Sequence, residues 1–592
     1  MKRSILAGAS ALALLSAASG AWAGNTSTIT QNSADSSAVV MQAAGVNETS
    51  DITQDGHTNS ADVTQSGNGN KANVYQKGDN VPASNNLVSS QAGVDGVLNV
   101  DQRGDNDADL TQTGAADQET VNLTQKGKNS ATTLQSGLLD IANIDQHGDG
   151  NDASATQSGS ANLANIDQTG ENNSATTSQA ANNGRIDIQQ GPSLFTSEGN
   201  TASATQTATA DNAKSRIRQF GDNNDATTKQ SGANAISDIL QIGDDNSADV
   251  KQAAAATSDI TQTGAHNIAT VNQKAGADGA KSLIIQTGDA NDAAVVQKGT
   301  GDDSKIFQTG ANNSGDVKQD GSNSSLLTQL GDHNSAKVRQ TGDGNSSDIT
   351  QGGAPPLWDP GDSYNTANVK QNGTDNVSTI KQVADNGKAK VDQDGTSNSS
   401  TINQGWAKTP SIPVIGDEWA DYATASVTQK GLQNTSQVDQ HADYGKAKVY
   451  QDGELNDSTI LQNPQASSPG APGAVADVSQ VGGSNLSTVT QSSASRAYVD
   501  QIGDDNNSDV VQLAFAGDSV ANVLQQGNTN LSTVSQGGSG GHKADINQTS
   551  DDNISHLIQT GSDNTAILNQ VSGNNLSNIN QSGAGNVANI TQ

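Results

Sequence analysis

An eleven-residue repeat runs through almost the whole chain and limits how it can fold. Between Gln31 and Gln592 there are 48 glutamines that mostly follow an apolar residue by two positions, and 31 of the 47 gaps between them are eleven residues long. The shared pattern is Gln-x-Gly-x-x-Asn-x-Ala-x-Val-x-Gln. A repeat this short and regular is typical of a solenoid, in which neighbouring units bury one another.

The residues within one repeat alternate in a way that predicts a strand. Asn, Ala, Val and Gln are separated by single polar residues, and this period of two is the signature of a strand rather than a helix. In a strand these four side chains point to one face. The Gly-x-x segment, often Gly-Asp-x-Asn, has the chemistry of a tight turn. We therefore expect an all-β fold, a β-solenoid of strand-turn-strand coils of about 22 residues in cross-β stacking.

The inward side chains are expected to form columns along such a stack. Val and Ala would make apolar columns, and Asn and Gln would make ladders, because a carboxamide has both donors and an acceptor and stacked copies can satisfy one another. The repeats Gln54–Gln65 and Gln329–Gln340 follow the pattern closely. The expected ladder residues are Asn59, Ala61, Val63, Gln65, Asn70, Ala72, Val74, Gln76, Asn334, Ala336, Val338 and Gln340, and the expected turn glycines are Gly56, Gly67, Gly78 and Gly331.

Proline supports this interpretation, because it cannot donate to a strand ladder and is excluded from central strands. Five gaps between the repeat glutamines are longer than fourteen residues, and all ten prolines fall inside them. Three tryptophans, Trp358, Trp406 and Trp419, lie in two of these gaps. We expect one continuous solenoid over residues 24–592, with loop insertions near 77–90, 191–205, 352–370, 405–428 and 463–479. The prolines are Pro82, Pro192, Pro355, Pro356, Pro360, Pro410, Pro413, Pro464, Pro469 and Pro472.

The first 23 residues predict a secretory signal peptide. Met1–Arg3 is positively charged, a mostly apolar run extends from Ile5 to Leu15, and Ala21–Ala23 gives a small-x-small cleavage site. The apolar run is too short to span a bilayer. We expect no other membrane insertion.

The composition restricts the partners and the kind of core. Hydrophobic residues make up 31% of the chain and aromatic residues 2%, so a conventional core of large side chains is not expected. The formal net charge of −33 disfavours nucleic acids and anionic membrane surfaces, which attract basic proteins. There is no cysteine, which excludes disulfides and thiolate metal sites.

No pattern of catalytic or ligand-binding residues emerges from the chain. The seven histidines are scattered without metal-ligand spacing, and no nucleophile elbow or triad context is present. Acidic turns such as 148–152 and 243–246 resemble calcium-binding turns of other solenoids, although the nine-residue beat of those proteins is absent. We expect no enzyme activity, no cofactor, and no catalytic or metal site.

The repeat resembles that of the curlin-repeat proteins, the subunits of bacterial curli amyloid fibres. The family pattern Gln-x-Gly-x-x-Asn-x-Ala-x-x-x-Gln is matched position for position by Gln65, Gly67, Asn70, Ala72 and Gln76. The family also has a half-repeat with Ser six residues before Gln. Here Ser36 occupies that place before Gln42, whereas most repeats have Asn, so the two halves are less distinct.

The resemblance implies a structural subunit of an extracellular curli-like amyloid fibre, which serves a biofilm matrix and adhesion on a Gram-negative bacterium. The implied partners are further copies of the chain, other curlin-type subunits and an outer-membrane secretion pore. Two alternatives stay open at this point. One is a monomeric secreted β-solenoid adhesin, and the other is a calcium-dependent surface protein.

Overall fold

The computed structural model describes residues 24–78, 84–113, 117–191, 197–352, 364–383, 385–405, 422–441, 443–463, 473–513 and 515–592. These residues form 46 strands and no helix. They divide into two compact units, the first ending at Asp289 and the second beginning at Ala290. Among the described residues, no helix exists that could cross a membrane.

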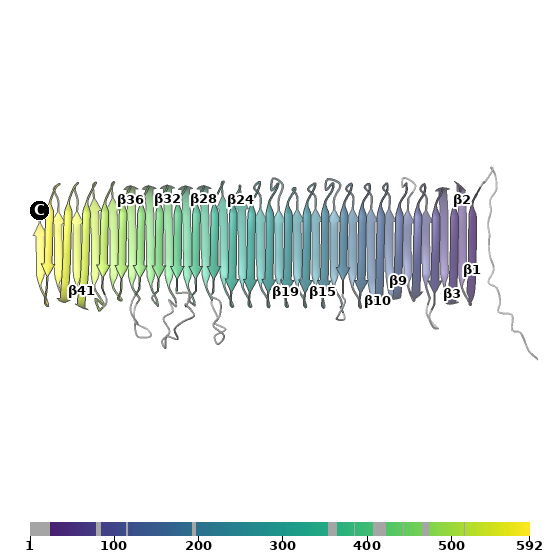
Figure 1. Cartoon of the computed structure of the whole chain (residues 1–592), viewed down its shortest axis with the longest axis horizontal. Coiled ribbons are helices and arrows are strands. Elements are labelled where there is room, and N and C mark those ends of the chain that lie inside the picture. Colours follow the sequence, from purple (N-terminus) through teal and green to yellow (C-terminus); the bar gives the residue numbers. More distant parts are fainter. Residues whose placement is uncertain are drawn as a thin grey trace, which may run out of the picture. The chain divides into compact units, whose positions relative to one another are not determined.

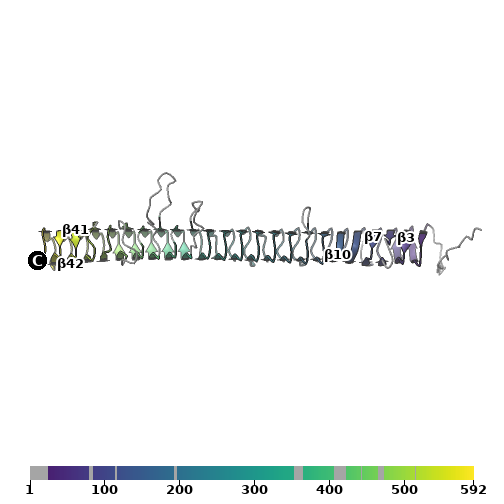
Figure 2. The same cartoon turned by 90° about the horizontal axis from the view of Figure 1, so that it is seen from below.

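In the first unit each coil gives one strand to each of two parallel sheets, here named X1 and Y1 (Figures 1 and 2). Two long strands, β9 (Thr120–Gln135) and β10 (Ile141–Gln157), pass from X1 to Y1 without a break. The other X1 strands are β1 (Thr26–Ala34), β3 (Thr49–His57), β5 (Lys71–Lys77), β7 (Val97–Gly104), β11 (Leu163–Thr169), β13 (Arg185–Gln190), β15 (Lys214–Phe220), β17 (Ile236–Ile242), β19 (Thr257–Thr263) and β21 (Lys281–Thr287). The other Y1 strands are β2 (Ser37–Val46), β4 (Ser60–Asn68), β6 (Asn86–Gln91), β8 (Asp107–Gln112), β12 (Ser174–Gln179), β14 (Thr201–Gln206), β16 (Asp225–Gln230), β18 (Ser247–Gln252) and β20 (Ile268–Gln273).

The second unit repeats this construction with sheets X2 and Y2. The odd-numbered strands form X2, namely β23 (Asp303–Thr309), β25 (Ser324–Leu330), β27 (Ser346–Gln351), β29 (Val377–Gln382), β31 (Ser399–Gln404), β33 (Thr435–Gln440), β35 (Asp457–Gln462), β37 (Leu486–Gln491), β39 (Asn507–Gln512), β41 (Leu531–Gly540), β43 (Ile554–Ser562) and β45 (Leu576–Gln581). The even-numbered strands form Y2, namely β22 (Asp292–Gln297), β24 (Ser314–Asp320), β26 (Ser335–Thr341), β28 (Thr366–Thr374), β30 (Lys388–Thr396), β32 (Thr424–Leu432), β34 (Lys446–Glu454), β36 (Val475–Gly483), β38 (Arg496–Ile502), β40 (Val520–Gln526), β42 (Lys543–Gln548), β44 (Thr565–Gln570) and β46 (Val587–Thr591).

Stacked strands pair in parallel and in register, so equal positions of the repeat lie above one another. Ile166 of β11, for example, pairs with Ile144 of β10 on one side and with Ile188 of β13 on the other. The inward Ala, Val and Ile side chains of both sheets of a unit are buried between the two layers. A direct contact across this core joins Ser215 Oγ of β15 to Thr228 Oγ1 of β16 at 2.7 Å. The predicted all-β solenoid with coils of about 22 residues is confirmed.

The turns stack as closely as the strands, and glycine permits this. Gly127 has φ of 111°, in the left-handed region that favours glycine. A Cβ atom at Gly127 would lie 2.0 Å from the carbonyl oxygen of Gly148 in the next coil. The turn glycine therefore supplies both the backbone conformation and the space that coil stacking requires.

The five long gaps between repeat glutamines all lie in connections that lead from an X strand to a Y strand. The described residues stop and resume between β5 and β6, β13 and β14, β27 and β28, β31 and β32, and β35 and β36. In each case the chain leaves an X strand and next enters a Y strand of the same unit. All ten prolines, the three tryptophans of the expected loops and the expected signal peptide 1–23 lie outside the described residues.

We predict that Gly127→Ala destabilises the first unit more than Gly279→Ala does. Both glycines have positive φ, but only Gly127 faces a carbonyl oxygen, whereas Gly279 has no atom within 4 Å of the missing Cβ. A left-handed conformation alone costs a non-glycine residue about 1–2 kcal/mol. Amide hydrogen exchange in β9 and β10 should accelerate strongly in Gly127→Ala, and exchange near Gly279 should accelerate less in its own variant, which carries the conformational cost alone. Equal effects of the two substitutions would contradict the stacking argument.

Candidate functional site

The chemistry of this molecule is concentrated in buried amide ladders that follow the stacking direction. In X1, Gln54 Nε2 donates to Gln76 Oε1 at 2.8 Å, and Gln76 Nε2 donates to Gln102 Oε1 at 2.9 Å. In Y1, Gln65 Nε2 donates to Gln91 Oε1 at 2.9 Å. Each glutamine of a ladder thus points its donor towards the next coil along the sequence.

The second N–H of the same amide group joins the two sheets of a unit. Gln76 Nε2 in X1 donates to the carbonyl oxygen of Ser60, the first residue of the Y1 strand β4, at 2.9 Å. Gln340 Nε2 in Y2 likewise donates to the carbonyl oxygen of Ser324 in X2 at 2.9 Å. Since the last inward position of one strand lies beside the start of the opposite strand, glutamine has the length to reach across. Each glutamine side chain of a ladder therefore links its coil to the next coil and also links the two sheets of the unit.

The asparagine ladders run with the opposite polarity. Asn173 Nδ2 and its backbone N–H both donate to Asn151 Oδ1, each at 3.1 Å, so the donors point towards the preceding coil. In the second unit, Asn398 makes the same pair of bonds to Asn376. Side-chain dipoles of the two ladder types are therefore antiparallel within a coil, and their fields partly oppose each other.

The residues that the sequence singled out lie in these columns. The exposed fraction is 4% or less for all twelve ladder residues, namely Asn59, Ala61, Val63, Gln65, Asn70, Ala72, Val74, Gln76, Asn334, Ala336, Val338 and Gln340. Gly56, Gly67 and Gly331 have positive φ values of 88°, 133° and 85°. The carbonyl oxygen of Gly78 lies 2.1 Å from where a Cβ of Gly56 would be, which places Gly78 in the same turn column.

Sequence reasoning missed four buried carboxyl groups that occupy asparagine positions. Glu48, Glu119 and Asp140 lie in the X1 column, six residues before a ladder glutamine, and Asp302 holds the equivalent place in X2; all are at most 1% exposed. Glu119 and Asp140 belong to adjacent coils, since the N–H of Thr120 donates to the carbonyl oxygen of Asp140. The offset from the glutamine was the available signal.

Burial changes the titration of these acids. Burial raises the pKa of Glu48 to about 7. Burial, and secondarily the Asp140 carboxylate, raise the pKa of Glu119 to about 8. Burial also raises the pKa of Asp140 to about 6, although the backbone N–H of Asn162 opposes this by donating to Asp140 Oδ1 at 2.9 Å. The protonated forms resemble the amides that they replace, because only a neutral carboxyl group can donate.

Histidine also enters an asparagine column once. His542 of Y2 is buried, its Nε2 lies 2.9 Å from the carbonyl oxygen of Gly537, and the N–H of Asn564 donates to its Nδ1 at 3.4 Å. The imidazole thus supplies the acceptor that Asn Oδ1 supplies elsewhere. Among the described residues, no group of three or more His, Asp or Glu side chains is arranged to hold a metal ion.

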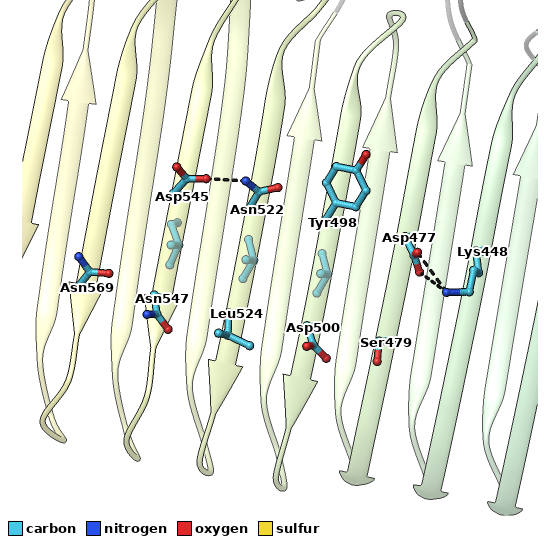
Figure 3. A pocket seen from close by; sticks show the side chains of 13 residues that line it. Lys448, Asp477, Ser479, Tyr498, Asp500, Asn522, Leu524, Asp545, Asn547 and Asn569 are labelled. Carbon is cyan, nitrogen blue, oxygen red and sulfur yellow. Dashed lines mark hydrogen bonds and ion pairs between the residues drawn. The ribbon is translucent and has the colours of Figure 1, made fainter.

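The outer faces are shallow, and one depression lies on Y2 (Figure 3). Its volume is about 580 Å³, and it is open to solvent. Tyr498 stands beside shorter residues such as Asp500 and Asn522, which produces the hollow. Lys448 at its edge pairs with Asp477 at 3.2 Å. This depression has the character of an uneven sheet surface rather than an enclosed binding site.

We predict that the first unit loses stability as the pH rises from about 4 to about 8. The folded-state pKa values of Glu119 and Asp140 are raised, so the stability is complete at low pH and is lost as the pH passes the folded pKa values. For each carboxyl group that is protonated in the folded state and ionised in the unfolded state, the free energy of unfolding falls by about 1.4 kcal/mol per pH unit. The double variant Glu119→Gln/Asp140→Asn should flatten the pH dependence of the protection factors against hydrogen exchange in β9 and β10, which compare each amide with the unfolded chain at the same pH.

The exposed Asp109→Asn substitution is the matched control, because it removes a carboxylate without touching a ladder. It should leave the slope unchanged. A pH slope that persists in the double variant, or one that vanishes equally in Asp109→Asn, would refute a role for the buried acids.

Comparison with known families agrees with this geometry. The curlin-associated repeat family matches six segments, residues 45–78, 140–170, 159–191, 221–253, 326–353 and 365–395, which occur in both units. No curated protein matches the chain. The matched segments include parts of these ladders, such as Gln54 and Gln76 in X1 and Asn151 and Asn173 in Y1, and the chain is therefore a curlin-repeat protein.

Proposed function

We propose that the chain is a structural subunit of an extracellular curli-like amyloid fibre, and that it assembles by end-to-end stacking of β-strands. The observation that carries this proposal is a set of open strand edges. Among the described residues, β1 and β2 pair only with β3 and β4, and β45 and β46 pair only with β43 and β44. Open edges present unpaired backbone N–H and C=O groups, which are templates for another chain.

The two ends are complementary in their side-chain ladders. At the β45–β46 end, Gln581 and Gln592 have amide N–H groups directed away from the preceding coil. At the β1–β2 end, Gln31 and Gln42 donate inward, to Gln54 and Gln65, which leaves their Oε1 atoms as acceptors facing outward. A joint between unlike ends therefore continues both glutamine ladders.

The asparagine positions favour the same joint. Asn564 Oδ1 accepts the backbone N–H of Asn586 at 2.9 Å, so the next acceptor in line is Asn586 Oδ1. Asn575 is the corresponding residue of X2. In a second copy, Asn25 holds the equivalent place at the start of X1, where its Oδ1 accepts from the backbone N–H of Glu48 in the next coil, so its own backbone N–H is the equivalent donor. Joining two like ends would place donor against donor or acceptor against acceptor, and buried unpaired polar groups cost about 1–3 kcal/mol each.

The remaining features of this function follow from the family and the sequence. A signal peptide over residues 1–23 would direct the chain out of the cytoplasm of a Gram-negative bacterium, and an outer-membrane pore would pass it to the surface. Partners are further copies and other curlin-type subunits in a biofilm matrix that supports adhesion. The role is structural rather than catalytic. The expected loop insertions are shorter than their sequence bounds, because the last residues of each range belong to the strands β6, β14, β28, β32 and β36.

We predict that Ala588→Lys/Ile590→Lys blocks growth at the β46 end. Both side chains face inward on the last strand, so two lysines would place charge in the apolar columns of the joint. Growth from preformed seeds, followed by thioflavin fluorescence and by fibre length in electron micrographs, should fall at least about tenfold, which corresponds to about 1.4 kcal/mol.

The matched control is Asn589→Lys, which adds charge to the outward face of the same strand. It should elongate seeds at close to the normal rate. If the unmodified chain stays monomeric in sedimentation and gives no cross-β reflection, fibre assembly is wrong, and a monomeric adhesin becomes the better description. Growth that appears only after addition of calcium would instead favour the calcium-dependent surface protein.

A further inference from the structure

A strongly basic surface interrupts this acidic chain. At the three outward positions that precede the ladder glutamine, six consecutive strands of Y2, from β24 to β34, carry eight cations and two carboxylates, Asp316 and Asp392. The ends of these strands beyond the glutamine add one cation, Lys430, and four carboxylates, Asp320, Asp394, Asp452 and Glu454. We name this surface the basic face. Its cations are Lys318, Lys337, Arg339, Lys370, Lys388, Lys390, Lys446 and Lys448. The chain as a whole has a net charge of −33, so this concentration of positive charge on one sheet is exceptional within the molecule.

Much of this charge is not neutralised locally. Lys318 and Lys337 share Asp316, Lys370 pairs with Asp392, and Lys448 pairs with Asp477 (Figure 3). The other four cations, Arg339, Lys388, Lys390 and Lys446, are exposed and form no ion pair with any described residue. The basic face therefore presents free positive charge to a partner.

An acidic counterpart exists on Y1 in the first unit. The outward positions of β4, β6, β8, the second halves of β9 and β10, β12 and β14 include four exposed carboxylates and no Lys or Arg. We name this surface the acidic face. Its carboxylates are Asp62, Asp107, Asp109 and Asp152. Most of its other outward residues are Ser and Thr, which are short and leave the carboxylates accessible to long lysine side chains.

We propose that the basic face docks sideways onto the acidic face of a second copy of this chain. Both surfaces are in-register parallel sheets, so their charges recur on the same axial spacing of about 4.8 Å. A match in spacing lets several ion pairs form together, and the combined contacts hold more firmly than single exposed pairs, which contribute little. A second copy is favoured as the occupant because it supplies the complementary face with the same repeat.

This docking does not depend on end-to-end growth, since it uses the sides of the solenoid. It would hold neighbouring solenoids together laterally. Because its strength is electrostatic between exposed groups, it should weaken when salt shortens the Debye length from about 10 Å at 0.1 M to below 5 Å at 0.5 M.

Zero-length carbodiimide cross-linking of the full chain tests the proposal, because that reagent joins amines to carboxylates in contact. An equal mixture of normal and isotope-labelled copies should give mixed-isotope links between peptides with Lys388, Lys390, Lys446 or Lys448 and peptides with Asp62, Asp107, Asp109 or Asp152. The yield of these links should fall at least about tenfold at 0.5 M NaCl. The Ala588→Lys/Ile590→Lys variant should retain them, which separates side docking from axial growth.

Charge reversal provides the decisive comparison. The variant Lys388→Glu/Lys390→Glu/Lys446→Glu/Lys448→Glu should lose side association, measured as particle width in electron micrographs and as sedimentation rate. The control Lys214→Glu/Lys281→Glu/Lys305→Glu/Lys381→Glu has the same net charge but changes other faces, and it should behave as the unmodified chain. Mixing the first variant with Asp62→Lys/Asp107→Lys/Asp109→Lys/Asp152→Lys chains should restore association.

Several results would overturn the proposal. Links confined to a single isotope, side association that survives in the first variant, or failure of the reversed pair to associate would each do so. A foreign occupant would also overturn it: the unmodified chain would then bind polyuronate or DNA at concentrations where copies stay apart, and the same four lysine substitutions would abolish that binding.

Discussion

The constraint on which this structure depends is the satisfaction of buried amide groups along one axis. A buried carboxamide that lacks partners costs several kilocalories per mole in an apolar environment. Gln168 avoids that cost by accepting from Gln146 and donating to Gln190, at 2.8 Å each, and this is possible only if successive coils keep the same register. A slip of one residue would turn every inward side chain outward. The amides therefore specify register in a chain whose apolar residues are too small to do so alone.

The alternation of the repeat was sufficient to predict the fold and the inward columns. Ala72 and Val74 needed only their period of two, and Gly56 needed only its place between two strands. The cross-sheet hydrogen bond from Gln76 to Ser60 could not be predicted from the sequence, because it depends on how the end of one strand lies beside the start of another. Repeat units describe stacking along one axis, and they carry little information about contacts across the core.

The buried acids illustrate a second limit. Glu119 and Asp140 occupy an asparagine position. Whether that position is buried depends on how closely the turns pack, and this is set by the backbone conformation. In the repeat pattern Glu119 is only a polar residue at an asparagine position, but in the structure its burial raises its pKa to about 8. The same limit applies to the surfaces. The even-numbered strands from β24 to β34 are brought together by coil stacking, so the lysines of Lys388–Thr396 and of Lys446–Glu454 gather on one sheet although 58 positions separate Lys388 from Lys446.

The length of the chain changes the energetics of fibre formation. In a stack, each coil contacts only its neighbours, so a joint between two subunits uses the same hydrogen bonds as a joint within one. The intermolecular joint alone also carries the loss of translational and rotational freedom, about 4–15 kcal/mol. Here 46 strands are covalently connected, and most coil–coil contacts form without that loss. A fibre of such subunits would have few joints for its length, and its growth would depend on the open edges of β1, β2, β45 and β46 rather than on the stability of the interior.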